Sequence, residues 1–283
     1  MTVTVTTLVE NTSGAPFIHG EWGQSMLVET DENTILFDTG PGDLIIENAS
    51  RLGVDLSQID KIVLSHGHYD HTGGMQAVLS ALLESGAKPD GIEIVAHPHV
   101  FQDKFIYVKG LVTHSCGMPF SREDLEGLGA RFTLSDKPVQ LNSFTLTTGE
   151  VQASTGHEKI DPALHIKNGE DYVPDELADD LGIIIKTEKG LVLLLGCAHR
   201  GIINTINHAR KITGVEKIYA VIGGTHLISA GLGQLEATVA ALKEMKIEKL
   251  GTSHCTGLIP ASILAHEFKG AFFFNSAGTK TVM

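Results

Sequence analysis

The stretch that decides the fold reads Ser65-His66-Gly67-His68-Tyr69-Asp70-His71-Thr72-Gly73-Gly74. It places three imidazoles and one carboxylate within six residues, directly after the apolar run at residues 62–64. Side chains two apart in an extended backbone project to the same side, so His66 and His68 can bind one ion. Asp70 and His71 lie where the chain begins to turn into a helix, and they can face a second ion. The segment therefore predicts two adjacent metal ions.

The pattern around this stretch predicts two halves, each with short strands followed by helices. In the first half we expect a helix at about 74–85 and strands at about 3–9, 25–29, 34–38, 61–64 and 92–96. In the second half we expect a hairpin over 182–187 and 191–195, a helix at about 201–212, a strand at 217–222, a helix with Leu235, Val239 and Leu242 on one face, a strand at 249–252 and an apolar run at 271–274. Two βα halves with their sheets back to back form a four-layer αββα sandwich, so the expected fold class is α/β.

The middle of the chain is less regular. Within a variable segment at about 76–144, Ser121 is predicted to cap a helix at about 122–128, and short strands are expected near 131–134 and 143–148. From residue 158 to residue 180 the charge density rises and prolines interrupt the pattern, so we expect a long loop at about 151–180 that borders the cleft. We expect residues 1–283 to form a single domain.

Several chemistry-bearing side chains follow apolar runs, which places them at the trailing ends of strands. Because strand ends on one rim of a sandwich meet in one cleft, residues far apart in sequence are expected to converge. These residues are Asp38, the histidines of segment 66–71, Cys197, His199, His226 and His254.

In these motifs the chain resembles the metallo-β-lactamase superfamily of binuclear metal hydrolases. The resemblance is carried by residues 35–40, 66–71, 196–199 and 253–257. Within the superfamily the chain is similar to the dihydropteroate-synthase-like subgroup, through Thr148-Gly149-Glu150, Gly196-Cys197-Ala198-His199-Arg200-Gly201, Gly223-Gly224-Thr225-His226-Leu227 and His254-Cys255-Thr256-Gly257. The resemblance implies the four-layer αββα fold of the superfamily, whose members differ widely in substrate.

The resemblance also implies roles for individual residues. His66 and His68 match ligands of the first ion, Asp70 and His71 match ligands of the second, and His254 matches the last motif histidine. Asp38 matches an aspartate that, in the superfamily, orients the metal loop by hydrogen bonds more often than it binds metal, so metal ligation by Asp38 stays an alternative. His226 corresponds to the position from which a tRNA 3′-processing relative donates a proton, so it joins Asp70 as a candidate catalytic residue.

The middle motifs depart from the superfamily pattern. Many relatives have a histidine in a Pro-Gly-His-Thr turn and a bridging aspartate after a glycine, whereas this chain has Thr148-Gly149-Glu150-Val151 and Gly196-Cys197. His199 could supply the missing imidazole, and Glu150 or Cys197 could ligate instead. A thiolate would favour zinc and a carboxylate would favour harder ions such as manganese. The expected cofactors are two divalent ions, zinc first, with manganese or iron as alternatives.

Two further residues are candidates for facing the substrate. His157 lies in a segment, residues 154–158, that is expected to reach over the cleft from a loop. Arg200 is expected near the rim, where its charge would help to hold an anion.

Composition limits the classes of function. The formal net charge of −13 opposes electrostatic binding to nucleic acid, which is held mainly by clustered Lys and Arg. No run of about 18 apolar residues could span a bilayer, and the first six residues alternate like a strand, so we expect a cytoplasmic protein without membrane contact. Three cysteines argue against a disulfide framework.

The expected reaction is therefore hydrolysis by a metal-activated water, on a small anionic substrate such as a phosphoester. The resemblance to the subgroup suggests an alternative, a transferase of pterin-cofactor synthesis that joins a dihydropterin to an aminobenzene ribose phosphate. Redox chemistry is a third reading, but di-iron relatives usually carry an additional flavin domain for which 283 residues leave no room.

Overall fold

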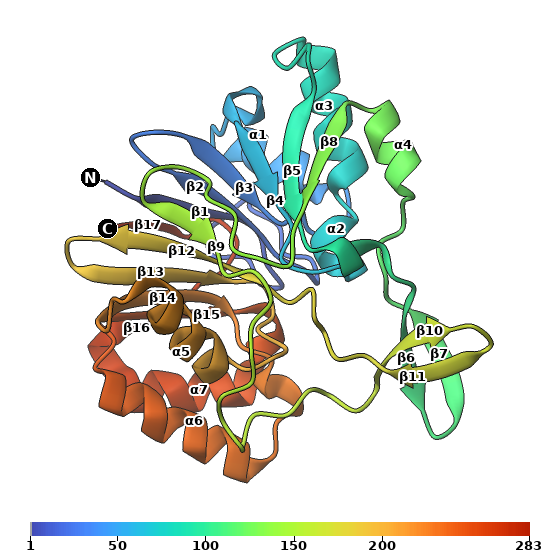
Figure 1. Ribbon diagram of the computed structural model, residues 1–283. Coiled ribbons are helices and arrows are strands. Elements are labelled where there is room, and N and C mark those ends of the chain that lie inside the picture. The colour runs from blue at the N-terminus through green and yellow to red at the C-terminus, as the bar shows by residue number, and fades with distance from the viewer. Residues whose placement is uncertain (1) are drawn as a thin grey trace. The chain divides into compact units, whose positions relative to one another are not determined.

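The computed structural model describes residues 2–283, which divide into two compact units (Figure 1). Unit 1 contains the residues up to 135, residues 162–175 and residues 276–283. Unit 2 contains residues 136–161 and 176–275. The histidine-rich stretch belongs to unit 1, whereas Cys197, His199 and His254 belong to unit 2.

Unit 1 is built on a seven-stranded sheet in the order β17-β1-β2-β3-β4-β5-β8. The strands from β3 to β8 run parallel, and β17, β1 and β2 pair antiparallel. The sequence predicted all of these strands except β17. Their bounds are β1 (Thr4–Val9), β2 (Ser25–Glu29), β3 (Thr34–Phe37), β4 (Lys61–Val63), β5 (Ile92–Ala96), β8 (Ala130–Leu134) and β17 (Lys280–Val282).

Helices cover this sheet through apolar side chains. Ile45, Leu79 and Leu125, one from each of the three larger helices, share a buried core with side chains of the central strands. Ser121 caps the last of these helices by accepting a hydrogen bond from the Asp124 N–H at 3.1 Å, as the sequence predicts. The bounds are α1 (Leu44–Arg51), η1 (Leu56–Gln58), α2 (Tyr69–Thr72), α3 (Met75–Ser85), η2 (Pro98–Phe101) and α4 (Arg122–Gly127).

A second sheet in unit 1 has four strands in the order β11-β10-β6-β7. They are β6 (Lys104–Val108), β7 (Leu111–Ser115), β10 (Leu164–Asn168) and β11 (Asp171–Pro174). The prediction of a long loop over 151–180 was therefore wrong for residues 164–174. Leu164 and Ile166 alternate with polar residues, and Gly169, at φ 64°, follows Asn168 in the turn, which is a hairpin signal that the high charge density obscured.

Unit 2 contains a six-stranded sheet in the order β16-β15-β14-β13-β12-β9. The strands from β13 to β16 run parallel, and β12 pairs antiparallel on both sides. The predicted hairpin corresponds to β12 and β13. The bounds are β9 (Thr145–Thr147), β12 (Gly182–Thr187), β13 (Gly190–Leu195), β14 (Ile218–Gly224), β15 (Lys249–Ser253) and β16 (Phe272–Phe274).

Three helices pack on the sheet of unit 2 through Ile206, Leu235 and Leu264. Two of them were predicted, and α7 was not. The bounds are α5 (Ile202–Thr213), η3 (Leu227–Ser229), α6 (Leu232–Met245), η4 (His254–Thr256), α7 (Leu258–Phe268) and η5 (Lys269–Ala271).

Both units thus combine a mixed sheet, in which four neighbouring strands run parallel, with helices, which confirms the α/β class. The strand ends β3, β4, β13, β14 and β15 each lead directly into a segment with a predicted site residue. Among residues 2–283, no helix is long and apolar enough to cross a membrane.

Candidate metal centre

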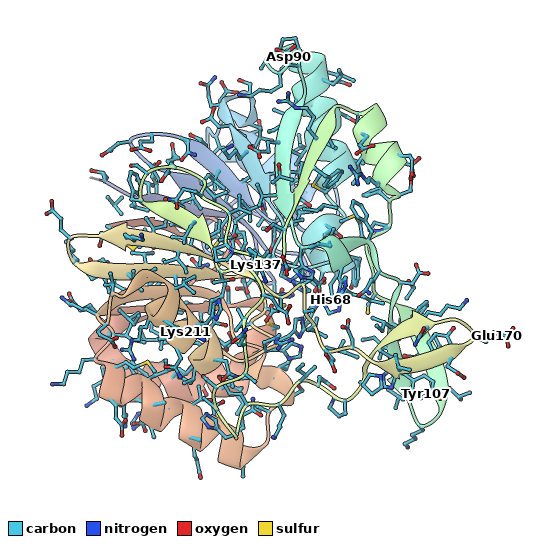
Figure 2. All side chains as sticks on the ribbon, viewed as in Figure 1. His68, Asp90, Tyr107, Lys137, Glu170 and Lys211 are labelled. Atoms are coloured by element: carbon cyan, nitrogen blue, oxygen red, sulfur yellow. The ribbon has the colours of Figure 1, made fainter. Side chains whose placement is uncertain are left out.

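The histidine-rich segment, residues 65–71, connects the end of β4 to α2 in unit 1; Figure 2 labels its His68. All three of its histidines are buried. The segment passes so close to Val100 that a Cβ on Gly67 would lie 2.2 Å from the Val100 carbonyl oxygen. Glycine is therefore required between two of the histidines.

Asp38, directly after β3, ties this segment to the neighbouring strand. Its buried carboxylate accepts hydrogen bonds from the backbone N–H and the hydroxyl of Ser65, both at 2.7 Å. Its Oδ2 also lies 2.7 Å from Nδ1 of His71. An imidazole whose Nδ1–H is held by a carboxylate carries its lone pair on Nε2, which is the usual arrangement of a metal-ligating histidine. Asp38 thus makes the hydrogen bonds that an orienting aspartate would make.

The imidazoles of the segment are in mutual contact. The ring centroid of His66 lies 4.5 Å from that of His68 and 4.3 Å from that of His71. Nε2 of His66 lies 2.9 Å from Nδ1 of His68. One cation at the usual zinc–nitrogen distance of about 2.0–2.1 Å can touch two nitrogens at this separation. The donor set of unit 1 therefore fits a divalent metal.

The four-stranded sheet supports the same segment through the backbone. The Tyr69 N–H donates to the Cys116 carbonyl at 2.9 Å, and the Cys116 N–H donates to the Lys104 carbonyl at 2.8 Å. The fully buried ammonium of Lys104 lies 2.7 Å from the carboxylate of Asp175. Burial raises the pKa of the Cys116 thiol to about 12, so this thiol stays protonated at neutral pH.

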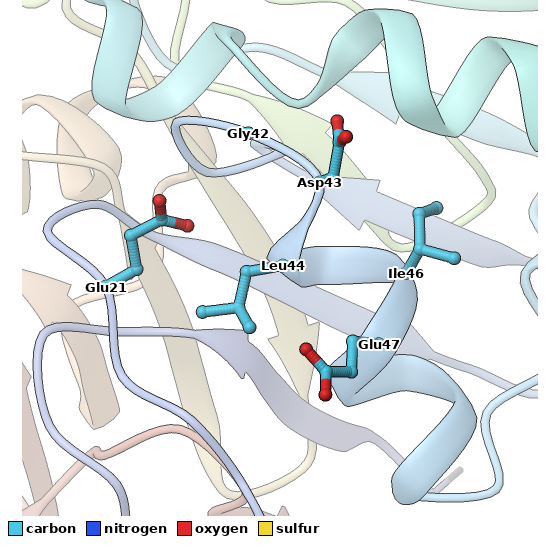
Figure 3. Close-up of a pocket in the computed structure, with 6 residues that line it drawn as sticks. All are labelled: Glu21, Gly42, Asp43, Leu44, Ile46 and Glu47. Carbon is cyan, nitrogen blue, oxygen red and sulfur yellow. The ribbon is translucent and has the colours of Figure 1, made fainter.

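A shallow pocket of unit 1 lies beside α1 (Figure 3). Burial and the charge of Asp43 raise the pKa of Glu21 on its wall. Three of its six lining residues are acidic, which disfavours an anionic ligand. The lining residues are Glu21, Gly42, Asp43, Leu44, Ile46 and Glu47.

In unit 2 the turn after β13 carries two of the alternative ligands, Cys197 and His199, and both are buried. Ala198 between them adopts the left-handed conformation at φ 50°, which turns the chain sharply at the end of the strand. The ring of His199 lies 4.2 Å from the ring of His226. The structure thus brings together a candidate ligand and the candidate general acid within unit 2.

Asp180 contacts the residue that follows this turn. The sequence had not indicated it as a site residue. Its Oδ2 accepts a hydrogen bond from the Arg200 N–H at 2.8 Å. Its Oδ1 has no hydrogen-bond partner among the described residues 2–283. Burial raises the pKa of Asp180 to about 7. In the sequence, the two neighbouring aspartates Asp179 and Asp180 before β12 could have drawn attention to this position. The sequence pattern alone did not reveal that the Asp180 carboxylate is buried.

A second residue that the sequence reasoning missed is Cys255. Its sulfur accepts a hydrogen bond from the His226 N–H at 3.3 Å and donates to the Cys197 carbonyl at 3.5 Å. A Cβ on Gly224 would lie 2.7 Å from this sulfur, so glycine makes room for the thiol. His254, the preceding residue in the chain, is buried, and its backbone is left-handed at φ 50°. Cys255 therefore connects the turns that carry these candidates.

Glu150 and Arg200, two other candidates, lie together in unit 2. The guanidinium Nη1 of Arg200 is 3.7 Å from a carboxylate oxygen of Glu150 and donates to the Glu176 carbonyl at 2.9 Å. Each charge is therefore already compensated within the unit.

His157 lies beside a residue that anchors its loop. The buried carboxylate of Glu158 accepts hydrogen bonds from the N–H groups of Ile203 and Asn204, both at 2.8 Å, at the start of α5. A Cβ on Gly201 would lie 2.2 Å from this carboxylate. Glu158 thus fixes the loop that carries His157 by accepting hydrogen bonds from the N-terminus of α5.

Residues 23–190 match the Metallo-beta-lactamase superfamily. The chain belongs to the metallo-beta-lactamase superfamily. This confirms the superfamily and its α/β fold as predicted from the motifs.

Two known proteins are similar over nearly the whole chain. The 7,8-dihydropterin-6-methyl-4-(beta-D-ribofuranosyl)-aminobenzene-5′-phosphate synthase of Methanocaldococcus jannaschii is 35% identical over 284 positions, covering 95% of this chain and 93% of the relative. The crystal structure of Tm1679, a metal-dependent hydrolase of the beta-lactamase superfamily, shares 25% identity at a TM-score of 0.81, with 99% of this chain and 98% of that chain covered. The first of these relatives confirms the predicted subgroup. Superfamily membership and the buried histidine groups support an enzyme that binds metal.

Proposed function

We propose that the chain is a metal-dependent hydrolase that holds two divalent ions and acts on a small anionic substrate such as a phosphoester. Zinc is the expected metal, and manganese or iron is the alternative. Residues 1–283 would act as one metallo-β-lactamase-type domain. The observation that carries the proposal is the group of buried imidazoles in unit 1, in which Nε2 of His66 lies 2.9 Å from Nδ1 of His68. The proposed ligands are His66, His68, Asp70 and His71 from unit 1, and His199 and His254 from unit 2.

The third ligand of the first ion is proposed to be His199. Glu150 is already paired with Arg200, and it is 41% exposed, which makes it the weaker candidate. Cys197 is buried beside Cys255 and is retained as the alternative ligand. A set of three imidazoles with an open position is the usual pattern of a catalytic zinc site.

The remaining residues have supporting roles in the proposal. When bound, the ions would supply Lewis acidity and activate water for attack. Asp38 would orient His71 by its hydrogen bond. His226 would donate a proton to the leaving group, because its ring lies beside His199. Arg200 and His157 would face the substrate.

A second candidate is the joining reaction of the M. jannaschii relative, because its 35% identity extends over 95% of this chain. On this alternative the chain would be a transferase that joins a dihydropterin to an aminobenzene ribose phosphate. Both reactions would use an anionic, phosphate-bearing substrate. They differ in whether water or an aromatic amine is the nucleophile. In the joining reaction the amine would form a bond to the 6-methyl carbon of the dihydropterin, and a leaving group such as a diphosphate would depart from that carbon.

The test begins with metal analysis of protein purified without added ions and then saturated with zinc or manganese. Two ions per chain are expected. His68→Ala should lower affinity at the first site, and Asp70→Ala should empty the second. His266→Ala, which removes an exposed histidine of α7, is the matched control and should retain both ions.

The loaded protein is then assayed against phosphodiesters, thioesters and lactones, and separately against a dihydropterin that carries a leaving group such as a diphosphate on its 6-methyl carbon, together with the aminobenzene ribose phosphate. Hydrolysis of an ester that falls by about 100-fold or more in His68→Ala would support the hydrolase. A coupled pterin product without ester hydrolysis would favour the transferase. At most one bound ion at saturation would contradict the binuclear site.

A further inference from the structure

The segment Trp22-Gly23-Gln24 of unit 1 packs against Asp70, and no role has so far been assigned to it. The indole N–H of Trp22 donates a hydrogen bond to Oδ2 of Asp70 at 3.1 Å. Two residues later, the Gln24 N–H donates to the Asp70 carbonyl at 3.1 Å. One segment therefore holds both the backbone and the side chain of a proposed metal ligand.

The approach of this segment depends on Gly23. A Cβ at this position would lie 2.4 Å from the Asp70 carbonyl oxygen and 2.6 Å from Cδ of Pro41. Because no side chain fits there, the backbone can come close enough for the indole of Trp22 to reach the Asp70 carboxylate. The close approach of the backbone to Asp70 is thus built into the fold of unit 1.

We propose that Trp22 is a positioning residue that fixes the Asp70 carboxylate for the second metal ion. The inference rests on the proposed metal centre. An indole N–H can only donate, so it binds one carboxylate oxygen and prevents the group from rotating. It carries no charge and does not titrate, so the full negative charge of Asp70 is kept for the metal. A lysine or arginine in its place would neutralise that charge.

Trp22 also makes the proposal measurable, because it is the only tryptophan of the chain and 48% of it is exposed. All intrinsic tryptophan fluorescence therefore arises beside Asp70. We expect zinc or manganese to change this fluorescence as the second site fills. In Asp70→Ala the change should disappear while elemental analysis still finds the first ion.

The second measurement uses Trp22→Phe, which keeps an aromatic ring but removes the donor. Affinity for the second ion should fall by about 10- to 100-fold, which is the usual effect of losing a residue that orients a ligand. Affinity for the first ion and the thermal midpoint of the metal-free protein should not change. Phe17→Leu, which removes an 81% exposed ring from the same unit, is the control and should bind both ions like the unmodified chain.

The outcomes separate this inference from the proposed function. Two ions bound with unchanged affinity in Trp22→Phe, or a fluorescence change that persists in Asp70→Ala, would overturn the role of Trp22 and leave the metal centre intact. A chain that takes up no metal would overturn both. A lower thermal midpoint of metal-free Trp22→Phe would assign Trp22 to packing and overturn the positioning role.

Discussion

Two regions bring their candidate side chains together in different ways: the histidine-rich segment of unit 1 and the turn at residues 196–199 of unit 2. In the first, the metal-binding candidates are neighbours in sequence, and Asp38 holds them through a carboxylate. In the second, His199, His226 and Cys255 come from separate strand ends and meet through left-handed turns and a thiol. A short motif thus carries most of its own geometry, whereas the second group exists only once the sheet of unit 2 has formed.

The largest expected effect concerns the support of the histidine-rich segment. Lys104→Met removes the buried partner of Asp175 and should lower the free energy of unfolding by about 3–5 kcal/mol. If the segment depends on the four-stranded sheet, metal affinity should fall as well. Chemical denaturation of the metal-free protein measures the first effect, and a zinc titration measures the second.

A double variant sharpens this prediction. Lys104→Met combined with Asp175→Leu removes both charges, and replacing a buried ion pair with apolar residues is often close to neutral. Stability should therefore recover in the double variant. An exposed ion pair contributes at most about 1 kcal/mol. If Lys104→Met lowers the free energy of unfolding by less than this, the pair is solvated.

These two regions also show what sequence can and cannot predict. The spacing of His66, His68 and His71 indicates metal chemistry by itself, because these candidate ligands are close together in the chain. The buried Asp180 and the thiol of Cys255 could not be predicted, since their environments are made by distant strands. The helix α7 was missed because Pro260 lies in its first turn, where proline is tolerated.

The next effect concerns the turn of unit 2 and depends on pH. The pKa of Asp180 is raised from 3.8 to about 7 in the folded chain, so between these values the folded state keeps a proton that the unfolded state has lost. Stability therefore falls as pH rises through this window. The slope is at most roughly 1.4 kcal/mol per pH unit.

Asp180→Asn removes this charge while keeping an acceptor for the Arg200 N–H. The free energy of unfolding of the metal-free variant minus that of the unmodified chain should grow from about pH 4 to about pH 7 and then stay level. Urea denaturation at several pH values measures it. A difference that does not depend on pH would show that Asp180 ionises normally.

The smallest effect concerns the left-handed backbone of the same turn. Ala198→Gly should raise the free energy of unfolding by about 0.5–1 kcal/mol, because glycine avoids the cost of about 1–2 kcal/mol for an alanine at positive φ. Ala240→Gly, at an exposed position of α6, should lower it by about 1 kcal/mol. A decrease in both variants would show that the turn is not strained.

The left-handed conformations of Asp38, Ala198, His226 and His254 have a consequence for the evolution of this fold. At Asp38, His226 and His254 the backbone favours glycine or asparagine, so stability alone would not retain the residues present. A lineage that lost its dependence on metal would no longer select for these side chains and could drift toward glycine. Glycine or asparagine at these strand ends would therefore mark relatives that kept the fold after giving up its chemistry.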